Sequence, residues 1–91
     1  MKLLLCKNCQ DVIRLVQEEV RTCRCGKVSG KYINDLDAIY SGDDAIPLGF
    51  ANSTLVEAIV NQPEGNGLGK VFTAFVIPKN CPTFVKINEV K

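Results

Sequence analysis

Histidine and tryptophan are absent from this chain of 91 residues. Without histidine, the protein lacks the commonest general base and the commonest nitrogen ligand for metal ions. Long apolar runs are also missing. The three leucines after Lys2 are fewer than the roughly 7 to 15 residues of a secretory signal core, and no stretch approaches the roughly 20 residues of a membrane span. We therefore expect a cytoplasmic protein without membrane contacts, whose thiols stay reduced.

Positive charge is missing from the middle of the chain. Residues 32–69 contain no lysine or arginine and six acidic residues, whereas residues 1–31 carry a net charge of +4 and residues 70–91 one of +3. The whole chain is nearly neutral at +1, and a dedicated nucleic-acid-binding protein of this size is usually more basic. The 29 Val, Ile, Leu and Phe residues suffice for a single folded domain, residues 1–91, with a head (1–31) and a body (32–91).

Six segments that are rich in apolar and β-branched residues or bounded by turn residues are expected as strands: residues 11–16, 20–23, 38–40, 45–48, 70–77 and 83–90. We expect the first two to pair as a hairpin, and the third and fourth to pair around the turn-forming sequence Ser-Gly-Asp-Asp. Pro47 cannot donate a hydrogen bond to a neighbouring strand, so its strand is expected to be short or at a sheet edge.

One helix is expected to begin near residues 52–54. Thr54 and Glu57 match the S/T-x-x-E capping box, and Asn52 or Ser53 are competing caps. The helix should end near residue 61, because proline and glycine follow. The side chains expected to face the core are Leu55, Ala58 and Ile59. The expected fold class is therefore α+β, mostly antiparallel strands with one helix.

Cysteine provides the strongest chemical signal, with five residues in so short a chain. Two residues separate Cys6 from Cys9, one residue separates Cys23 from Cys25, and thirteen residues lie between the two pairs. Two tight turns can bring four thiolates around a zinc ion, which takes tetrahedral sulfur ligands at about 2.3 Å. A rubredoxin-like iron, disulfides or free thiols are the alternatives. Cys81 stands apart and is expected to be a small buried or turn residue.

This cysteine pattern resembles that of zinc ribbons over residues 1–31, with one departure. Ribbons usually have two residues inside each cysteine pair, whereas the second pair here encloses only Arg24. The resemblance implies an N-terminal zinc-ribbon-like β-hairpin unit, joined to a small, mostly antiparallel sheet with one helix. Zinc held by four thiolates has no open ligand position, so it is expected to be structural and to stabilise a head with few large apolar residues.

Catalytic residues cannot be assembled from this sequence. Its serines and threonines have no histidine partner, and the spacing of its aspartates matches no EF-hand loop. The glycine-rich residues 65–69 do not form a phosphate-binding loop, because Glu64 and Val71 stand where that motif requires glycine and a hydroxyl residue. We expect a flexible connection there and a protein that is not an enzyme.

A wider resemblance covers roughly residues 6–60. The chain is similar there to short bacterial and bacteriophage proteins. The segments that carry the resemblance are Cys-x-x-Cys, Arg-Thr-Cys-Arg-Cys-Gly-Lys, Gly-Lys-Tyr and Ile-Pro-Leu-Gly-Phe-Ala-Asn. The resemblance implies a phage or prophage origin, and small phage proteins often bind host proteins, including components of host defence systems.

The function expected from the sequence is therefore non-enzymatic recognition of a macromolecule, with a protein as the favoured partner. The candidate contact residues are the bases of the head: Lys7, Arg14, Arg21, Arg24 and Lys27. The alternatives are nucleic-acid binding through the same head, which would weaken steeply with salt, and capture of a small ligand such as a nucleotide between residues 53–61 and the sheet.

Overall fold

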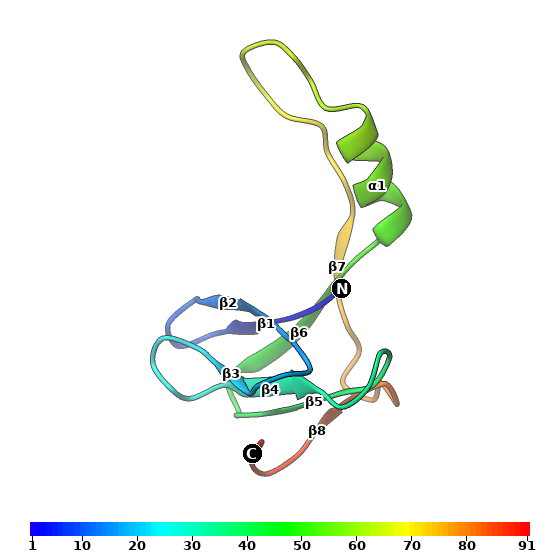
Figure 1. Cartoon of the computed structure of the whole chain (residues 1–91). Helices are drawn as coiled ribbons and strands as arrows, with labels where there is room; N and C mark the ends of the chain where they lie inside the picture. Colours follow the sequence, from blue (N-terminus) through cyan, green and yellow to red (C-terminus); the bar gives the residue numbers. More distant parts are fainter.

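The computed structural model describes residues 1–91 and confirms the α+β class, with two small sheets and a single helix. Nine elements follow one another along the chain: β1 (Lys2–Cys6), β2 (Val12–Arg14), β3 (Arg21–Thr22), β4 (Ser29–Tyr32), β5 (Ala38–Ser41), β6 (Ala45–Phe50), α1 (Asn52–Val60), β7 (Ala74–Val76) and β8 (Phe84–Lys86). The strands lie together in the two sheets, and α1 with the following loop projects from them (Figure 1). No helix has the length and apolar character that crossing a bilayer requires.

The first sheet has the strand order β2-β1-β6-β7, and all its pairs are antiparallel. Its strand β1 comes from the leucine run near the N-terminus, which the sequence analysis did not assign to a strand. Leu3, Leu4 and Cys6 are buried there, so both faces of β1 are largely covered. A short, continuous apolar run is typical of such a strand, but alternation cannot reveal it.

The second sheet has the order β3-β4-β5-β8, in which only the β5–β8 pair is parallel. The core joins the two sheets: Leu4 of β1 and Leu15 belong to the same cluster as Val28, Tyr40 and Phe84. Tyr40 and Phe84 pack edge to face, with ring centroids 5.0 Å apart. Residues 1–31 and 32–91 are therefore not separate layers, since β1 pairs with β6 and β4 with β5.

The two hairpins expected from the sequence are wrong. Strand β2 pairs with β1, and β3 pairs with β4, so residues 11–16 and 20–23 lie in different sheets. Strands β5 and β6 also belong to different sheets, although a short turn connects them. Strand propensity marks these segments correctly, but their pairing is decided by the tight cysteine turns and by the apolar residues that each sheet presents to the shared core.

Pro47 does not lie at a sheet edge, because β6 is flanked by β1 and β7. The Pro47 carbonyl accepts a hydrogen bond from the Ile77 N–H at 2.9 Å, just beyond the end of β7. The N–H and C=O of one strand residue point to the same side, so the donor that proline lacks would face β7 and not β1. The β1–β6 ladder therefore loses no hydrogen bond.

Helix α1 ends at Val60, one residue before its C-cap Asn61, as the sequence predicts, but its expected caps are wrong. Ala51 is the N-cap residue, and no side chain caps the helix. The Thr54 hydroxyl donates to the Ala51 carbonyl at 2.8 Å and accepts the Thr73 N–H at 2.9 Å. Thr54 therefore ties the start of the helix to the chain that leads into β7.

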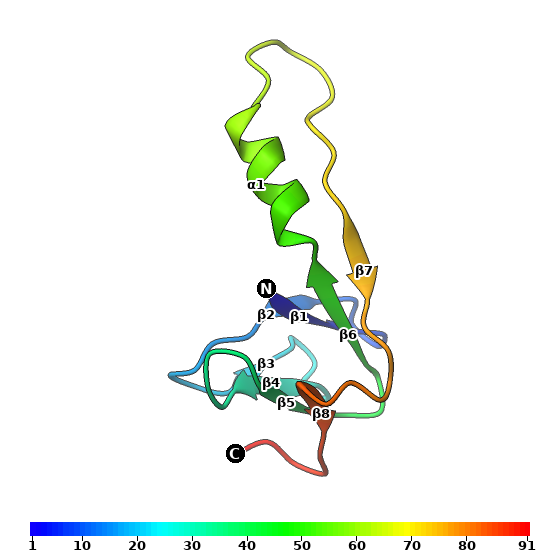
Figure 2. The same ribbon diagram turned by 90° about the vertical axis from the view of Figure 1, so that its right-hand side faces the viewer.

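The side chains of helix α1 are mostly exposed, so the helix packs against little of the rest of the protein. Of the three residues expected in the core, Ala58 is buried and Leu55 is half-buried, but Ile59 is 62% exposed. The segment expected as a strand over residues 70–77 forms only β7, and residues 83–90 form only β8. We call residues 51–77 the arm. Its helix and loop reach away from the two sheets in both views (Figures 1 and 2), and the molecule measures 46 × 27 × 25 Å.

Gly42 allows the turn between β5 and β6 to lie against the turn between β3 and β4. Its φ is +112°, and a Cβ atom at this position would lie 2.3 Å from the carbonyl oxygen of Lys27. Both the backbone conformation and the contact therefore exclude a side chain.

We expect Gly42→Ala to lower the free energy of unfolding by about 2–4 kcal/mol, through backbone strain and overpacking. Gly65→Ala is the matched control, because Gly65 has no positive φ and nothing lies within 4 Å of its added Cβ. The measurement is urea unfolding of both variants with zinc present. Equal stability of the two variants would contradict this packing.

Candidate metal centre

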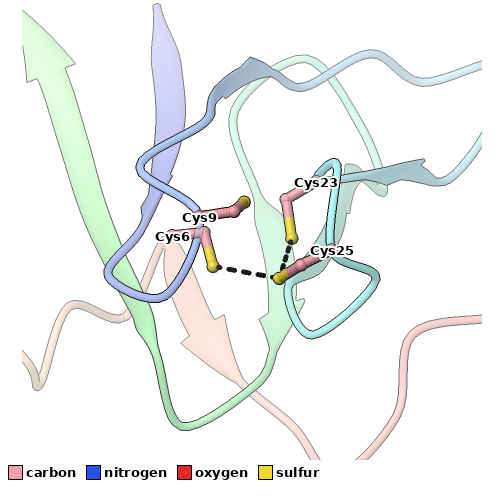
Figure 3. A group of neighbouring side chains, drawn as sticks. All are labelled: Cys6, Cys9, Cys23 and Cys25. Carbon is pink, nitrogen blue, oxygen red and sulfur yellow. Dashed lines mark hydrogen bonds between the residues drawn. The ribbon is translucent and has the colours of Figure 1, made fainter.

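The four paired cysteines come together although they lie on different sheets. Cys6 is the last residue of β1 and Cys9 lies in the turn between β1 and β2, whereas Cys23 and Cys25 lie in the turn between β3 and β4. Their sulfur atoms all lie within 4.8 Å of one another (Figure 3). The sequence prediction that these four residues form one cluster is therefore confirmed, and they are positioned to bind a metal ion.

Two of the six sulfur–sulfur distances match those of a tetrahedral site. Four sulfurs at about 2.3 Å from a central ion lie about 3.8 Å from one another. The Cys6 and Cys25 sulfurs are 3.7 Å apart, and the Cys23 and Cys25 sulfurs 3.5 Å apart. A disulfide bond would need about 2.0 Å, and all five cysteines are free.

The two turns share one construction, which explains how the shorter second pair fits. The Cys6 N–H donates to the Asp11 carbonyl, and the Cys23 N–H donates to the Val28 carbonyl, both at 2.9 Å, so each turn closes over the same length. The residue after the second cysteine has a positive φ in both turns, +61° at Gln10 and +83° at Gly26. With one residue fewer between its cysteines, the second turn closes with a Gly26 N–H to Cys23 carbonyl bond of 3.0 Å.

Residues outside the four cysteines hold the turns in place. The Val28 N–H donates to the Cys23 sulfur at 3.3 Å. The Asp11 side chain accepts the Arg24 N–H at 2.9 Å, while its carbonyl accepts the Cys6 N–H, so Asp11 links both turns. No local pattern in the sequence identifies Asp11, because the N–H group that its side chain accepts belongs to Arg24, thirteen residues away.

The thiols differ in burial and in acidity. Cys6 and Cys23 are buried, Cys9 is half-buried and Cys25 is exposed. The Asn8 side chain and the Lys27 N–H hydrogen-bond to Cys25 and lower its pKa to about 6. The Cys9 N–H lowers the pKa of Cys6, but burial and the neighbouring thiols of Cys25 and Cys9 outweigh it and raise the pKa to about 11. The Asp11 N–H lowers the pKa of Cys9.

All five bases expected to contact a partner are exposed: Lys7, Arg14, Arg21, Arg24 and Lys27. Three of them, Lys7, Arg24 and Lys27, belong to the two cysteine turns, and they offset the negative charge that four thiolates leave around a divalent ion. Arg21 pairs with Glu19, with 3.1 Å between the guanidinium and carboxylate atoms.

Cys81 does not belong to the cluster. It is half-buried in the turn before β8, and its sulfur lies 3.4 Å from the Thr83 hydroxyl. This contact and the Thr83 N–H lower the pKa of Cys81. Its placement agrees with the turn residue that the sequence predicts, and it provides an internal control for experiments on the other four thiols.

A cavity of about 470 Å³ lies on the arm, between α1 and the glycine-rich loop. Leu55, Ala58, Leu68 and Phe72 are among its lining residues. It differs from the expected ligand pocket between the helix and the sheet, because no residue of a strand lines it.

We expect Cys23→Ser to abolish stoichiometric zinc binding, whereas Cys81→Ser retains one ion per chain. A structural zinc site contributes on the order of 10–16 kcal/mol to folding, so Cys23→Ser should also unfold at a lower temperature than Cys81→Ser. Elemental analysis after dialysis against a weak chelator and thermal unfolding measure the two effects. Equal zinc contents of the two variants would overturn the assignment of ligands.

Zinc binding should be stronger at pH 8 than at pH 6 by at least about tenfold, because ligand thiols must lose their protons. The Cys6 thiol, with its pKa raised to about 11, keeps its proton at both values until the ion displaces it, so uptake releases protons. Protonation of Cys25, whose pKa is about 6, adds a further loss of affinity as the pH falls toward 6. Calorimetry in buffers of different ionisation enthalpy measures both effects. An affinity independent of pH would contradict thiolate ligation.

Comparison with family models, with curated proteins and with solved structures finds no match for this chain. The similarity of residues 6–60 to short bacterial and bacteriophage proteins therefore stays an expectation from the sequence. The metal centre is assigned from the convergence of its four sulfur atoms.

Proposed function

We propose that this is a non-enzymatic zinc-binding protein that recognises a protein partner. The observation that carries the proposal is the placement of four sulfur atoms within 4.8 Å of one another, on two turns from different sheets. Four protein ligands leave a tetrahedral ion no open position for a substrate or an activated water. The ion then serves the fold, and the surface that it stabilises serves recognition.

Zinc is the proposed ion because of its chemistry. Tetrahedral sites of four sulfurs are typical of zinc and of iron. Zinc has no redox chemistry of its own and stays bound to reduced thiolates, so an ion with a purely structural role is best supplied by zinc. The exposed Cys25 would make an iron centre accessible to oxidants in solvent, which supports the redox-inert ion.

The proposed contact surface consists of the two cysteine turns and the strands that leave them. Lys7, Arg24 and Lys27 are exposed there, which favours an acidic partner. Acidic groups are interspersed, however: Glu19 pairs with Arg21, and Asp11 lies against the backbone of Arg24. A surface of mixed sign supports a protein partner better than the continuous phosphates of a nucleic acid. The resemblance noted above would place that partner in a bacterial host.

Affinity capture from bacterial lysate with two matched triple variants tests this proposal. Replacement of Lys7, Arg24 and Lys27 by glutamine should weaken capture of the partner about tenfold, because the complementary charges are lost. The control replaces Lys70, Lys79 and Lys91, which lie outside both cysteine turns, and should leave capture unchanged. Both variants should retain zinc.

Equal capture by the two variants would overturn the contact surface. Capture that disappears after nuclease treatment and falls steeply with salt would assign the partner as a nucleic acid. Loss of capture from the zinc-free wild type alone would show only that the ion maintains the fold.

A further inference from the structure

The molecule exposes more surface than a monomer of its mass should. A folded monomer of 10.0 kDa exposes about 5,200 Å², whereas this chain exposes 6314 Å². Its radius of gyration, 14.6 Å, also exceeds the roughly 12 Å of a compact domain of this length. The excess of about 1,100 Å² is larger than the roughly 800 Å² that each partner buries in a standard interface.

The arm projects from the two sheets (Figure 2). Seven of the twelve exposed large apolar residues of the chain belong to it. Among them, Leu68 is 98% exposed, Val71 89% and Val60 77%. An apolar projection of this size is uncommon on a soluble monomer and usually marks a contact surface.

Strand β7 provides the arm with an open sheet edge. It is the outermost strand of its sheet and pairs only with β6. The Ile77 N–H and the Thr73 carbonyl bond to β6 and its extension, so Phe75 between them also faces β6. The N–H and C=O groups of Ala74 and Val76 therefore point away from the sheet and are free to pair.

Of the four edge strands in the protein, only β7 contains no charged residue. The other three edge strands each contain a base, namely Arg14 in β2, Arg21 in β3 and Lys86 in β8. Strand β7 contains Ala, Phe and Val alone, and no charged residue occurs between Lys70 and Lys79. Edge strands of monomeric proteins are usually protected by charge, proline or a bulge, so an unprotected apolar edge indicates that something covers it.

We propose that a second copy of this chain covers the arm, with the two β7 strands paired antiparallel across a twofold axis. In the register that places Phe75 opposite Phe75 of the partner subunit, Ala74 lies opposite Val76 of the partner subunit. All four outward N–H groups of the two strands then find carbonyl acceptors. The β2-β1-β6-β7 sheets of the two subunits then become one continuous sheet.

A second copy fits this surface for reasons of charge, area and symmetry. Each chain carries a net charge of +1 and the paired edge carries none, so two copies meet with little repulsion. The excess area is large enough for what each subunit of a dimer buries, and a twofold axis closes the assembly without leaving a further edge to propagate. The inference does not depend on the proposed function, because none of the five bases of the head lies on the arm.

Light scattering on the zinc-loaded full chain after gel filtration, over about 1 to about 100 μM, tests the proposal. The wild type should reach twice the chain mass of 10.0 kDa. Val76→Lys should remain a monomer at every concentration, because it places a charge on the paired edge. Val85→Lys, on the edge strand β8 of the other sheet, is the matched control and should dimerise like the wild type.

A second measurement needs no substitution. Exchange of the Ala74 and Val76 amide hydrogens should slow at least about tenfold as the concentration rises through the dimerisation range, while the Phe75 amide, already bonded to β6, changes less. A wild type that stays monomeric at about 100 μM overturns the proposal and assigns the arm to a different partner. A folded, zinc-containing Val76→Lys that dimerises like the wild type overturns it as well.

Discussion

The fold depends on the convergence of two short turns on one point. Each turn belongs to a different sheet, and each directs two sulfur atoms toward the other turn. Four thiolates repel one another strongly unless a cation lies between them, so this arrangement is stable as a metal centre. The Asp11 bridge between the turns, made through one side-chain and one backbone hydrogen bond, adds alignment but little of the binding energy.

The cysteine cluster and the apolar core are continuous. Only 16 of the 91 residues are buried, which is few for an independently stable domain. Cys6 and Cys23 are members of the same buried cluster as Leu4, Val28 and Phe84, so the ion would lie at the rim of the core. Residues 1–31 therefore supply both the ligands and some of the best buried apolar side chains, and loss of the ion would loosen both sheets.

The arm, unlike the cysteine turns, has few buried side chains. Its helix has no side-chain cap, buries only Ala58 and is held to the following chain by Thr54. The helix and the loop after it add surface and contribute no residue to the core cluster, a cost that contacts with another chain can offset. The recognition surface proposed at the cysteine turns and the self-association surface proposed at β7 lie on separate parts of the sequence, so one assembly can present two copies of the first.

The sequence by itself determined the fold class, the four clustered cysteines and the end of the helix, because each depends on local residue chemistry and spacing. It did not determine the pairing of strands. Residues 11–16 have the propensity of a strand whether they pair with residues 20–23 or with β1, and the leucines of β1 carry no alternation to announce a strand buried on both faces. The hydrogen bonds of Thr54, the place of Pro47 and the exposure of Ile59 likewise depended on segments distant in sequence. Only the tertiary structure decided them, because hydrogen-bond partners and burial are properties of what packs alongside a residue and not of the residue itself.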